Sequence, residues 1–223
     1  MRAEAAGRAI RGIISATDPN RPFVNRPGSK SFSIDMTLKL RLLDGLPVYG
    51  EMAIAYPESF GKTGRQGTVV EFETDKRGWV GNFQPGLYGL DRAEQHPNKR
   101  DGMVIAAGDL WVVDADTGAA ECLLPAVYSA IPMADRSGWV FSRQDIALAR
   151  FGPEGIVWHT KRLSWDGFDQ VQISGRKITG LAYDPMGDTW EPFEVDLQTG
   201  ESVGGSYLMD DGDEWERLAS PRV

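Results

Sequence analysis

Four segments decide the fold of this chain: VVEFETDKRGWVG (69–81), LWVVDADTGAAECLL (110–124), LARFGPEGIVWHT (148–160) and PFEVDLQTGESVGG (192–205). In each of them an apolar, alternating strand runs into a short turn that closes on a glycine, and an outgoing strand follows. The closing glycines are 78, 118, 155 and 200, so the turns recur at intervals of 40, 37 and 45 residues. A recurrence near 40 residues is typical of a repeated unit of about four strands.

The strand before the first repeat shows the same alternation. In SFSIDMTLKLRLLDG (31–45) the apolar residues occupy the even positions from Ile34 to Leu42. This period of two predicts a half-buried strand. Asp44-Gly45 is a hairpin signal, and VYGEMAIAY (48–56) is expected to return as its partner strand. The two strands are either a fifth unit or the completion of the first.

The rest of the chain also favours strands and turns. We expect a loop at 57–67, a loop or one helical turn at 86–102, and a hairpin over 168–183 with its turn at 174–177. No segment carries a long helical stripe. Because parallel βαβ units need a helix in each crossover, a doubly wound α/β fold is not expected.

Two of the turns resemble the blade hairpins of β-propellers that carry a V-D-x-x-T-G sequence. They are VDADTG (113–118) and VDLQTG (195–200). An Asp or Thr side chain can bond nearby backbone amides, and glycine supplies the positive φ that closes the reversal. The flanking strand alternates as well, with Phe193, Val195 and Leu197 on one face and Glu194 and Asp196 on the other.

A third turn, AYDPMGDTW (182–190), resembles the Asp-box hairpin of sialidase-like propellers. It departs from that pattern because Ala182 replaces the usual Ser and one residue is inserted before Gly187. The resemblance therefore implies a turn and no catalytic role. The propeller-like region extends over about 50–207.

From these patterns we predict an all-β fold, an antiparallel β-propeller-like array of four or five units. A β-sandwich, a barrel, a curved open sheet or a mixed α+β fold is the alternative. The expected organisation is an N-terminal segment at 1–30 (a helix or a closing strand, then a loop), the repeated β domain at 31–208 and an acidic C-terminal tail at 209–223.

Composition limits the partners. The chain has 24 basic and 32 acidic residues and a formal net charge of −8, which argues against binding to nucleic acid or an anionic membrane and permits a basic protein partner. No apolar run approaches 18 residues, and arginines interrupt the N-terminal segment, so neither a membrane anchor nor a signal peptide is expected and a cytoplasmic location is the default. Cys122 is the only cysteine and is expected to be a small buried hydrophobe.

Known catalytic and cofactor motifs are missing. GKT at 61–63 lacks the glycine that a phosphate-binding loop needs five residues earlier, where Tyr56 stands. One cysteine and two histidines far apart in sequence do not make a zinc site, and the acidic run at 210–213 lacks the spacing of a calcium loop. We therefore expect no metal, no cofactor and no catalytic residue.

Carboxylates on one face of a strand support a different interpretation. Glu71 with Glu73, and Glu194 with Asp196, could form the acidic pair of a glycoside hydrolase. Strand alternation explains both pairs as the solvent face of an amphipathic strand, and we favour that explanation. An enzyme that processes a carbohydrate or metabolite in a central pocket is thus the alternative function.

The candidate binding segment is HTKRLSWDGFD (159–169). It joins one repeat hairpin to the next strand and mixes aromatic, basic and acidic side chains, namely His159, Lys161, Arg162, Trp165, Asp166 and Phe168. Neighbouring aromatic and arginine side chains are typical of binding hot spots. The competing interpretation is that Trp165 packs in the core and the charged residues are simply solvated.

The resulting hypothesis is a non-enzymatic binding or adaptor module that engages a protein partner through loops on one rim of a β scaffold. A homodimer formed through exposed sheet edges is a further expectation, because an array that does not close leaves edge strands to be covered.

Overall fold

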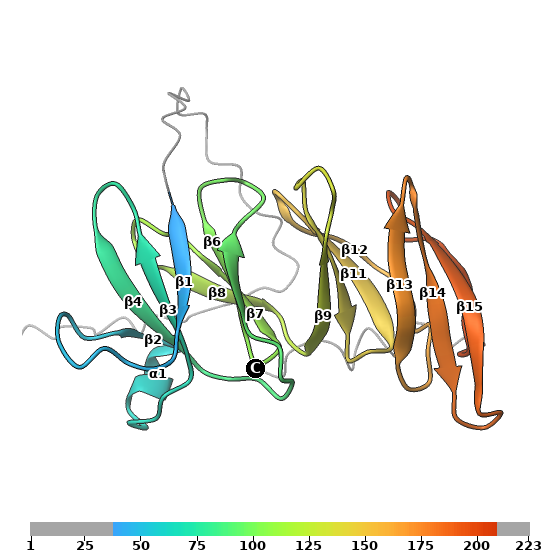
Figure 1. The fold of residues 1–223 in the computed structure, drawn as a ribbon, viewed down its shortest axis with the longest axis horizontal. Helices are drawn as coiled ribbons and strands as arrows, with labels where there is room; N and C mark the ends of the chain where they lie inside the picture. Colours follow the sequence, from blue (N-terminus) through green and yellow to red (C-terminus); the bar gives the residue numbers. More distant parts are fainter. Residues whose placement is uncertain (1–37, 209–223) are drawn as a thin grey trace, which may run out of the picture. The chain divides into compact units, whose positions relative to one another are not determined.

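The structure, a computed structural model, describes residues 38–208. The expectations for the N-terminal segment, for the first part of the strand at 31–45 and for the acidic tail lie outside the described residues. Within 38–208 the chain forms four four-stranded sheets, A to D, and one short helix (Figure 1). The prediction of an all-β fold is confirmed.

Each sheet is built from one continuous stretch of chain. Sheet A contains β1 (Lys39–Leu43), β2 (Ile54–Tyr56), β3 (Thr68–Glu73) and β4 (Gly78–Phe83), and α1 (Glu58–Gly61) follows β2. Sheet B contains β5 (Arg92–Gln95), β6 (Gly102–Ala106), β7 (Asp109–Val113) and β8 (Ala120–Leu124). Sheet C contains β9 (Val127–Pro132), β10 (Trp139–Arg143), β11 (Ala147–Gly152) and β12 (Gly155–His159). Sheet D contains β13 (Phe168–Ser174), β14 (Lys177–Asp184), β15 (Thr189–Asp196) and β16 (Ser202–Gly204).

The repeated glycine turns occupy the same place in every sheet. They join the third and fourth strands in chain order: β3 to β4, β7 to β8, β11 to β12 and β15 to β16. The two V-D-x-x-T-G turns are closed alike. Asp196 accepts bonds from the amides of Gln198 and Thr199 at 2.8 and 3.0 Å, and Gly118 and Gly200 both have a φ of 76°. Local turn chemistry therefore sets the repeat that is visible in the sequence.

Three apolar cores hold successive sheets face to face. The first lies between sheets A and B, where Phe72 stacks on Trp79 at 4.1 Å between ring centroids. The second joins B to C around Phe141 and Phe151, and the third joins C to D around Phe193. Burying one such side chain contributes about 1.5–3 kcal/mol.

Within residues 38–208 no apolar core joins sheet D to sheet A. The sheets therefore form a propeller-like array that does not close. Among the described residues, sheets B and C each have a neighbouring sheet on both faces, whereas A and D each have one on a single face.

The prediction of a hairpin at Asp44-Gly45 is wrong. β1 pairs with β3, and β2 pairs in parallel with β4, so the candidate fifth unit completes sheet A instead. Pro47 lacks the N–H that a returning strand would donate. In addition, β3 places Phe72 opposite Leu40, which extends the apolar face of the sheet.

Three further expectations are now settled. The hairpin over 168–183 is confirmed as β13 and β14. The polar stretches hold more structure than expected, since α1 lies within 57–67 and β5 within 86–102. Cys122 is exposed rather than buried, because β8 is the outer edge strand of sheet B.

Candidate interaction surface

The strand ends form two rims, and only one of them carries the crossings between sheets. We call it the connection rim; it contains the inter-sheet connections 84–91, 125–126 and 160–167, the β1–β2 loop 44–53, and the hairpin turns 107–108, 144–146 and 185–188. The opposite edge, the hairpin rim, contains the turns 74–77, 96–101, 114–119, 133–138, 153–154, 175–176 and 197–201. The connection rim runs along the lower edge of Figure 1.

Backbone hydrogen bonds make the connection rim continuous. Each crossing is bonded to a neighbouring turn: Gly86 N to Ala106 O at 2.9 Å, Val127 N to Gly108 O at 2.7 Å, Gln144 N to Ala126 O at 2.7 Å and Leu163 N to Ile146 O at 2.8 Å. The segment after β16 joins the same ladder, because Tyr207 N donates to Leu163 O at 3.1 Å. These bonds fix the crossings between sheets, whereas the β1–β2 loop and the β14–β15 turn lie outside this ladder.

Exposed large apolar side chains gather on the connection rim. Its loops and turns, with the segment after β16, contain Leu46, Val48, Tyr49, Met52, Leu87, Met186 and Leu208, with exposed fractions from 40% to 96%. Within residues 38–208 none of the hairpin-rim turns contains an exposed large apolar side chain. Those turns are polar and carry ion pairs such as Lys76–Asp116 at 2.6 Å. The two rims thus differ sharply in chemistry.

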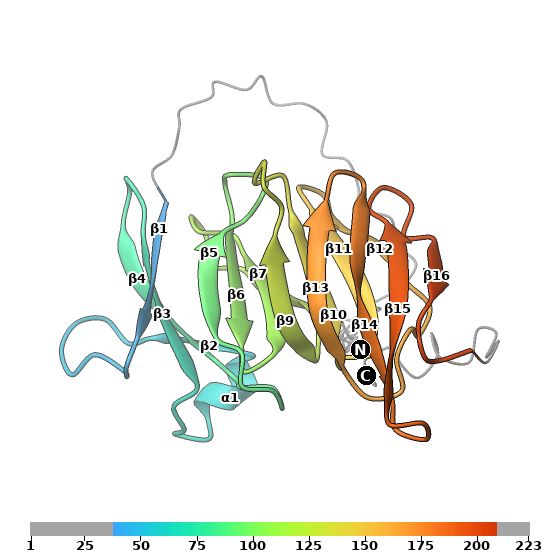
Figure 2. The same ribbon diagram turned by 45° about the vertical axis from the view of Figure 1, so that its right-hand side comes forward.

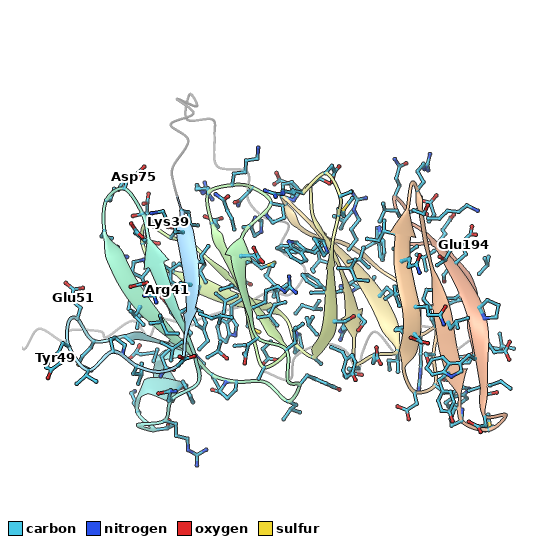
Figure 3. The ribbon with its side chains drawn as sticks, viewed as in Figure 1. Lys39, Arg41, Tyr49, Glu51, Asp75 and Glu194 are labelled. Carbon is cyan, nitrogen blue, oxygen red and sulfur yellow. The ribbon has the colours of Figure 1, made fainter. Side chains whose placement is uncertain are left out.

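The β1–β2 loop is the most exposed apolar segment. Val48, Tyr49 and Met52 are 86%, 91% and 93% exposed. Figure 3 shows Tyr49 on this loop, beyond the strands of sheet A. The base of the loop is fixed, because the Gln66 side chain accepts a bond from Leu46 N at 3.2 Å. Its apolar side chains are therefore presented to solvent from an anchored base.

A second apolar spot lies at the crossing between sheets A and B. Tyr88 packs edge-on against Tyr128 with ring centroids 5.9 Å apart, and Tyr128 is 53% exposed. The adjoining Leu87 is 96% exposed. The amide of Tyr88 donates to Ala107 O at 2.8 Å, which fixes this crossing to the β6–β7 turn.

Two residues of the candidate binding segment are brought together on the same rim. The Arg162 guanidinium lies 5.0 Å from the centroid of the Trp165 ring and donates to the carbonyl oxygens of Ser164 and Trp165, both at 2.9 Å. It also lies 4.3 Å from the Tyr207 ring, which packs against Trp165 at 4.6 Å. Sequence reasoning missed Tyr207, because no pattern links it to a segment 40 residues earlier.

The other four residues are placed differently. Phe168 packs on Phe193 at 5.1 Å against the core between sheets C and D, so it belongs to the scaffold. Lys161 and Asp166 are exposed in the crossing. His159 ends β12 on the exposed side; partial burial of its ring, and then the charge of Arg143, lower the pKa of His159.

The carboxylates of the alternative enzymatic reading are engaged in ion pairs on sheet surfaces. Glu71 pairs with Arg41 at 2.7 Å and Glu73 with Lys39 at 3.3 Å on the outward face of sheet A. Glu194 pairs with Lys177 at 2.7 Å and Asp196 with Arg176 at 3.3 Å on sheet D. Among residues 38–208 no three potential metal-ligating side chains cluster, and the same residues contain no helix long and apolar enough to cross a bilayer.

No family model and no curated protein matches this chain. Among solved structures, the β-propeller domain of the Trilobed protease from Pyrococcus furiosus, described as having an open velcro topology, is similar with a TM-score of 0.39 and 11% identity, covering 63% of this chain and 49% of that one. Dihydro-heme d1 dehydrogenase NirN in complex with DHE is similar with a TM-score of 0.41 and 16% identity, and the match covers 63% of this chain and 32% of that one. BamB from Moraxella catarrhalis is similar with a TM-score of 0.37 and 14% identity, and the match covers 75% of this chain and 50% of that one.

The chain thus spans half or less of the length of each of these structures. Its own architecture, four four-stranded sheets stacked in chain order, places it in the propeller-like class of repeat folds, and no specific family is assigned.

Proposed function

We propose that this protein is a non-enzymatic binding module that engages a protein partner through the connection rim. The observation that supports this function is the one-sided distribution of exposed apolar side chains. Residues such as Tyr49 and Met52 are almost fully exposed on a loop that is held at its base, while the hairpin rim is polar. Concentrated exposed apolar surface marks sites of protein contact, and loops on a rigid scaffold commonly carry binding.

The energetics fit association with a protein. Removing a side chain of this size from water contributes about 1.5–3 kcal/mol, so three such residues can offset much of the cost of association. Arg162, Trp165 and Tyr207 add a preorganised aromatic and guanidinium cluster of the kind found in hot spots. The chain's net charge of −8 favours a partner that is basic around the contact.

The test compares three forms of the full chain immobilised at equal density. The rim variant carries Tyr49→Ser and Met52→Ser, and the control carries Lys76→Ser and Arg136→Ser on the hairpin rim. We expect a protein that is captured by the wild type and by the control but is lost with the rim variant. Equal capture by all three forms, or no specific capture by any of them, would contradict the proposal.

The candidate segment is tested separately. Asp166→Lys reverses an exposed acidic charge in the crossing without touching the stacked cluster, so against a basic partner we expect it to weaken capture of the same protein and leave the thermal midpoint unchanged. Trp165→Ala removes the ring on which Arg162 lies. If both variants capture as the wild type does, this segment has no part in the contact and the rim site is confined to the β1–β2 and β4–β5 loops.

A further inference from the structure

The outward face of sheet D changes character along its strands. Towards the hairpin rim it carries two ion pairs, Lys177–Glu194 at 2.7 Å and Arg176–Asp196 at 3.3 Å (Glu194 is labelled in Figure 3). At the other end, next to the β14–β15 turn, register places Tyr183 opposite Trp190. Figure 2 shows this turn extending past the lower end of sheet D. An aromatic pair therefore ends the sheet where it meets the connection rim.

The rings of Tyr183 and Trp190 form an open pair. Their centroids lie 5.0 Å apart with the planes tilted by 45°. Trp190 is 45% exposed, more than any other tryptophan of residues 38–208. The Tyr183 hydroxyl donates to the Asp188 carboxylate at 2.8 Å, and the Tyr183 carbonyl accepts a bond from the Ser206 hydroxyl at 2.7 Å. Tyr183 is therefore held in place beside a ring that is open to solvent.

Three carboxylates lie around this pair without a cationic partner. The pKa of Tyr183 is raised chiefly by its hydrogen bond to Asp188, and the charges of Asp188, Asp166 and Asp184 contribute, so all three lie near the phenol. Asp184 also shapes the turn, because its Oδ1 accepts a bond from the Met186 amide at 2.9 Å. Within residues 38–208 none of the three carboxylates forms an ion pair. The aromatic pair therefore lies in a negative potential that no neighbouring charge compensates.

Other tryptophan rings of this chain are covered by arginine. Three guanidinium groups lie over indoles: Arg77 over Trp79 at 5.6 Å, Arg92 over Trp139 at 5.1 Å and Arg162 over Trp165 at 5.0 Å. Among the described residues no cation lies over Trp190, although the carboxylates around Tyr183 favour one. A planar guanidinium can stack on a ring face and donate to a carboxylate at the same time, which a compact ammonium group does less well. The missing group therefore has the chemistry of an arginine side chain.

We propose that Tyr183, Trp190 and Asp188 form a subsite for an arginine side chain of the partner protein. The guanidinium stacks on the exposed Trp190 ring and donates to the Asp188 carboxylate, while Asp166 and Asp184 add attraction over a longer range. The source of the arginine rests on the proposed function, because the subsite adjoins the connection rim at the turn 185–188. A sugar ring could stack on the same side chains, but it would leave the negative charge uncompensated.

Titration of the full chain, isotope-labelled for NMR, with a capped tetra-arginine peptide tests the subsite without the partner. Low salt and millimolar peptide suit a single exposed subsite. We expect the indole N–H signal of Trp190, assigned by its absence in Trp190→Leu, to shift on binding, and that variant to lose the peptide. Asp188→Asn keeps an acceptor for the Tyr183 hydroxyl and should weaken binding about threefold or more. The control Glu73→Gln makes the same change in net charge on sheet A and should bind as the wild type does.

A capped tetralysine peptide separates arginine recognition from general attraction, and we expect it to bind about threefold more weakly or worse. Equal binding of the two peptides, or equal weakening by Asp188→Asn and Glu73→Gln, would overturn the proposal, because either result means that net charge alone attracts the peptide. A cello-oligosaccharide that shifts the Trp190 signal when the arginine peptide does not would overturn it too and would identify a carbohydrate platform. Circular dichroism and the thermal midpoint of each variant establish that loss of binding is not loss of the fold.

The rim variant separates this proposal from the proposed function. Tyr49→Ser with Met52→Ser leaves the subsite unchanged, so it should bind the arginine peptide as the wild type does while losing the captured protein. Peptide binding without any captured protein would contradict the connection-rim contact alone. Capture of a protein without peptide binding would contradict the arginine subsite alone.

Discussion

The hydroxyl of Tyr56 donates a hydrogen bond to the carbonyl oxygen of Gly118 and so joins β2 of sheet A to the β7–β8 turn of sheet B. The Tyr56 ring stacks on Phe83 at 4.7 Å within the core between the two sheets. Burial raises the pKa of Tyr56 to about 12, against the opposing charge of Arg77. The hydroxyl therefore stays protonated, and remains a hydrogen-bond donor, well above neutral pH.

Replacing Tyr56 by Phe tests this link. The substitution keeps the stacked ring and leaves the Gly118 carbonyl without its donor, so we expect the free energy of unfolding to fall by about 1–2 kcal/mol. Urea unfolding followed by fluorescence measures the change. Tyr49→Phe, in the exposed β1–β2 loop, is the control and should leave the midpoint unchanged. Equal stability of the two variants would mean that the bond contributes nothing net.

His96 predicts a loss of stability in mild acid. Its side chain is 3% exposed and meets the Phe151 ring edge-on at 4.8 Å, which places it against the core between sheets B and C. Burial lowers the pKa of His96 below 6.5, although the Asp101 carboxylate opposes the shift. The unfolded chain therefore takes up a proton at a pH where the folded chain does not. Stability is highest above the unfolded value of about 6.5 and falls as the pH drops below it.

Urea unfolding at a series of pH values between about 7.5 and 5.5 measures how steeply the free energy of unfolding changes with pH. His96→Asn keeps an acceptor for the Asn98 amide, which bonds Nδ1 at 3.0 Å in the wild type, and removes the titrating group. We expect a shallower slope in the variant. The pKa of His159 is lowered as well, so His159 accounts for the pH dependence of stability that remains in the variant. Burial raises the pKa of Asp109 and Asp145, so these groups act in the opposite sense, closer to pH 4. Identical slopes would exclude His96 as the cause.

The sequence was sufficient for the repeated parts of the fold because their determinants are local. Strand alternation placed Phe193 and Val195 inward, and turn chemistry placed Gly118 and Gly200. Sheet A was read wrongly because its pairing is not local. The partner of β1 is β3, which begins 25 residues after β1 ends, and no dipeptide signal encodes that choice.

The candidate site was predictable only in part, for a similar reason. The aromatic and arginine residues of 159–168 identified a crossing on the connection rim, and Arg162 with Trp165 do lie together. Their third member, Tyr207, comes from the chain after β16. The β1–β2 loop was missed because the apolar residues at 46–54 look like an ordinary strand, and only the three-dimensional arrangement shows that Val48, Tyr49 and Met52 have no core to join.

The V-D-x-x-T-G turns carry a prediction about stability. Asp114 Oδ1 accepts hydrogen bonds from the amides of Asp116 and Thr117 at 3.1 and 2.9 Å. Asp114→Ala leaves both amides to solvent, so we expect the free energy of unfolding to fall by about 1 kcal/mol. Asp114→Asn retains an oxygen at the same position and should keep most of the stability. If Asn destabilises as much as Ala, the charge rather than the acceptor geometry is what matters.

Cys122 predicts an unusually slow thiol. The residue is exposed on edge strand β8, yet partial burial of its sulfur, and then the Asp109 and Glu121 carboxylates, raise the pKa of Cys122 to about 12. Because the thiolate is the reactive form, the native protein at pH 8 should react with a disulfide reagent roughly fiftyfold more slowly than an ordinary cysteine of pKa near 8.5, since the greater nucleophilicity of a more basic thiolate offsets part of its smaller population. The same protein in concentrated urea should react at the ordinary rate, which serves as the control. Asp109→Asn should speed the native reaction by removing one of the opposing charges. Fast labelling of the native wild type would show that exposure, and not the environment of the sulfur, governs this thiol.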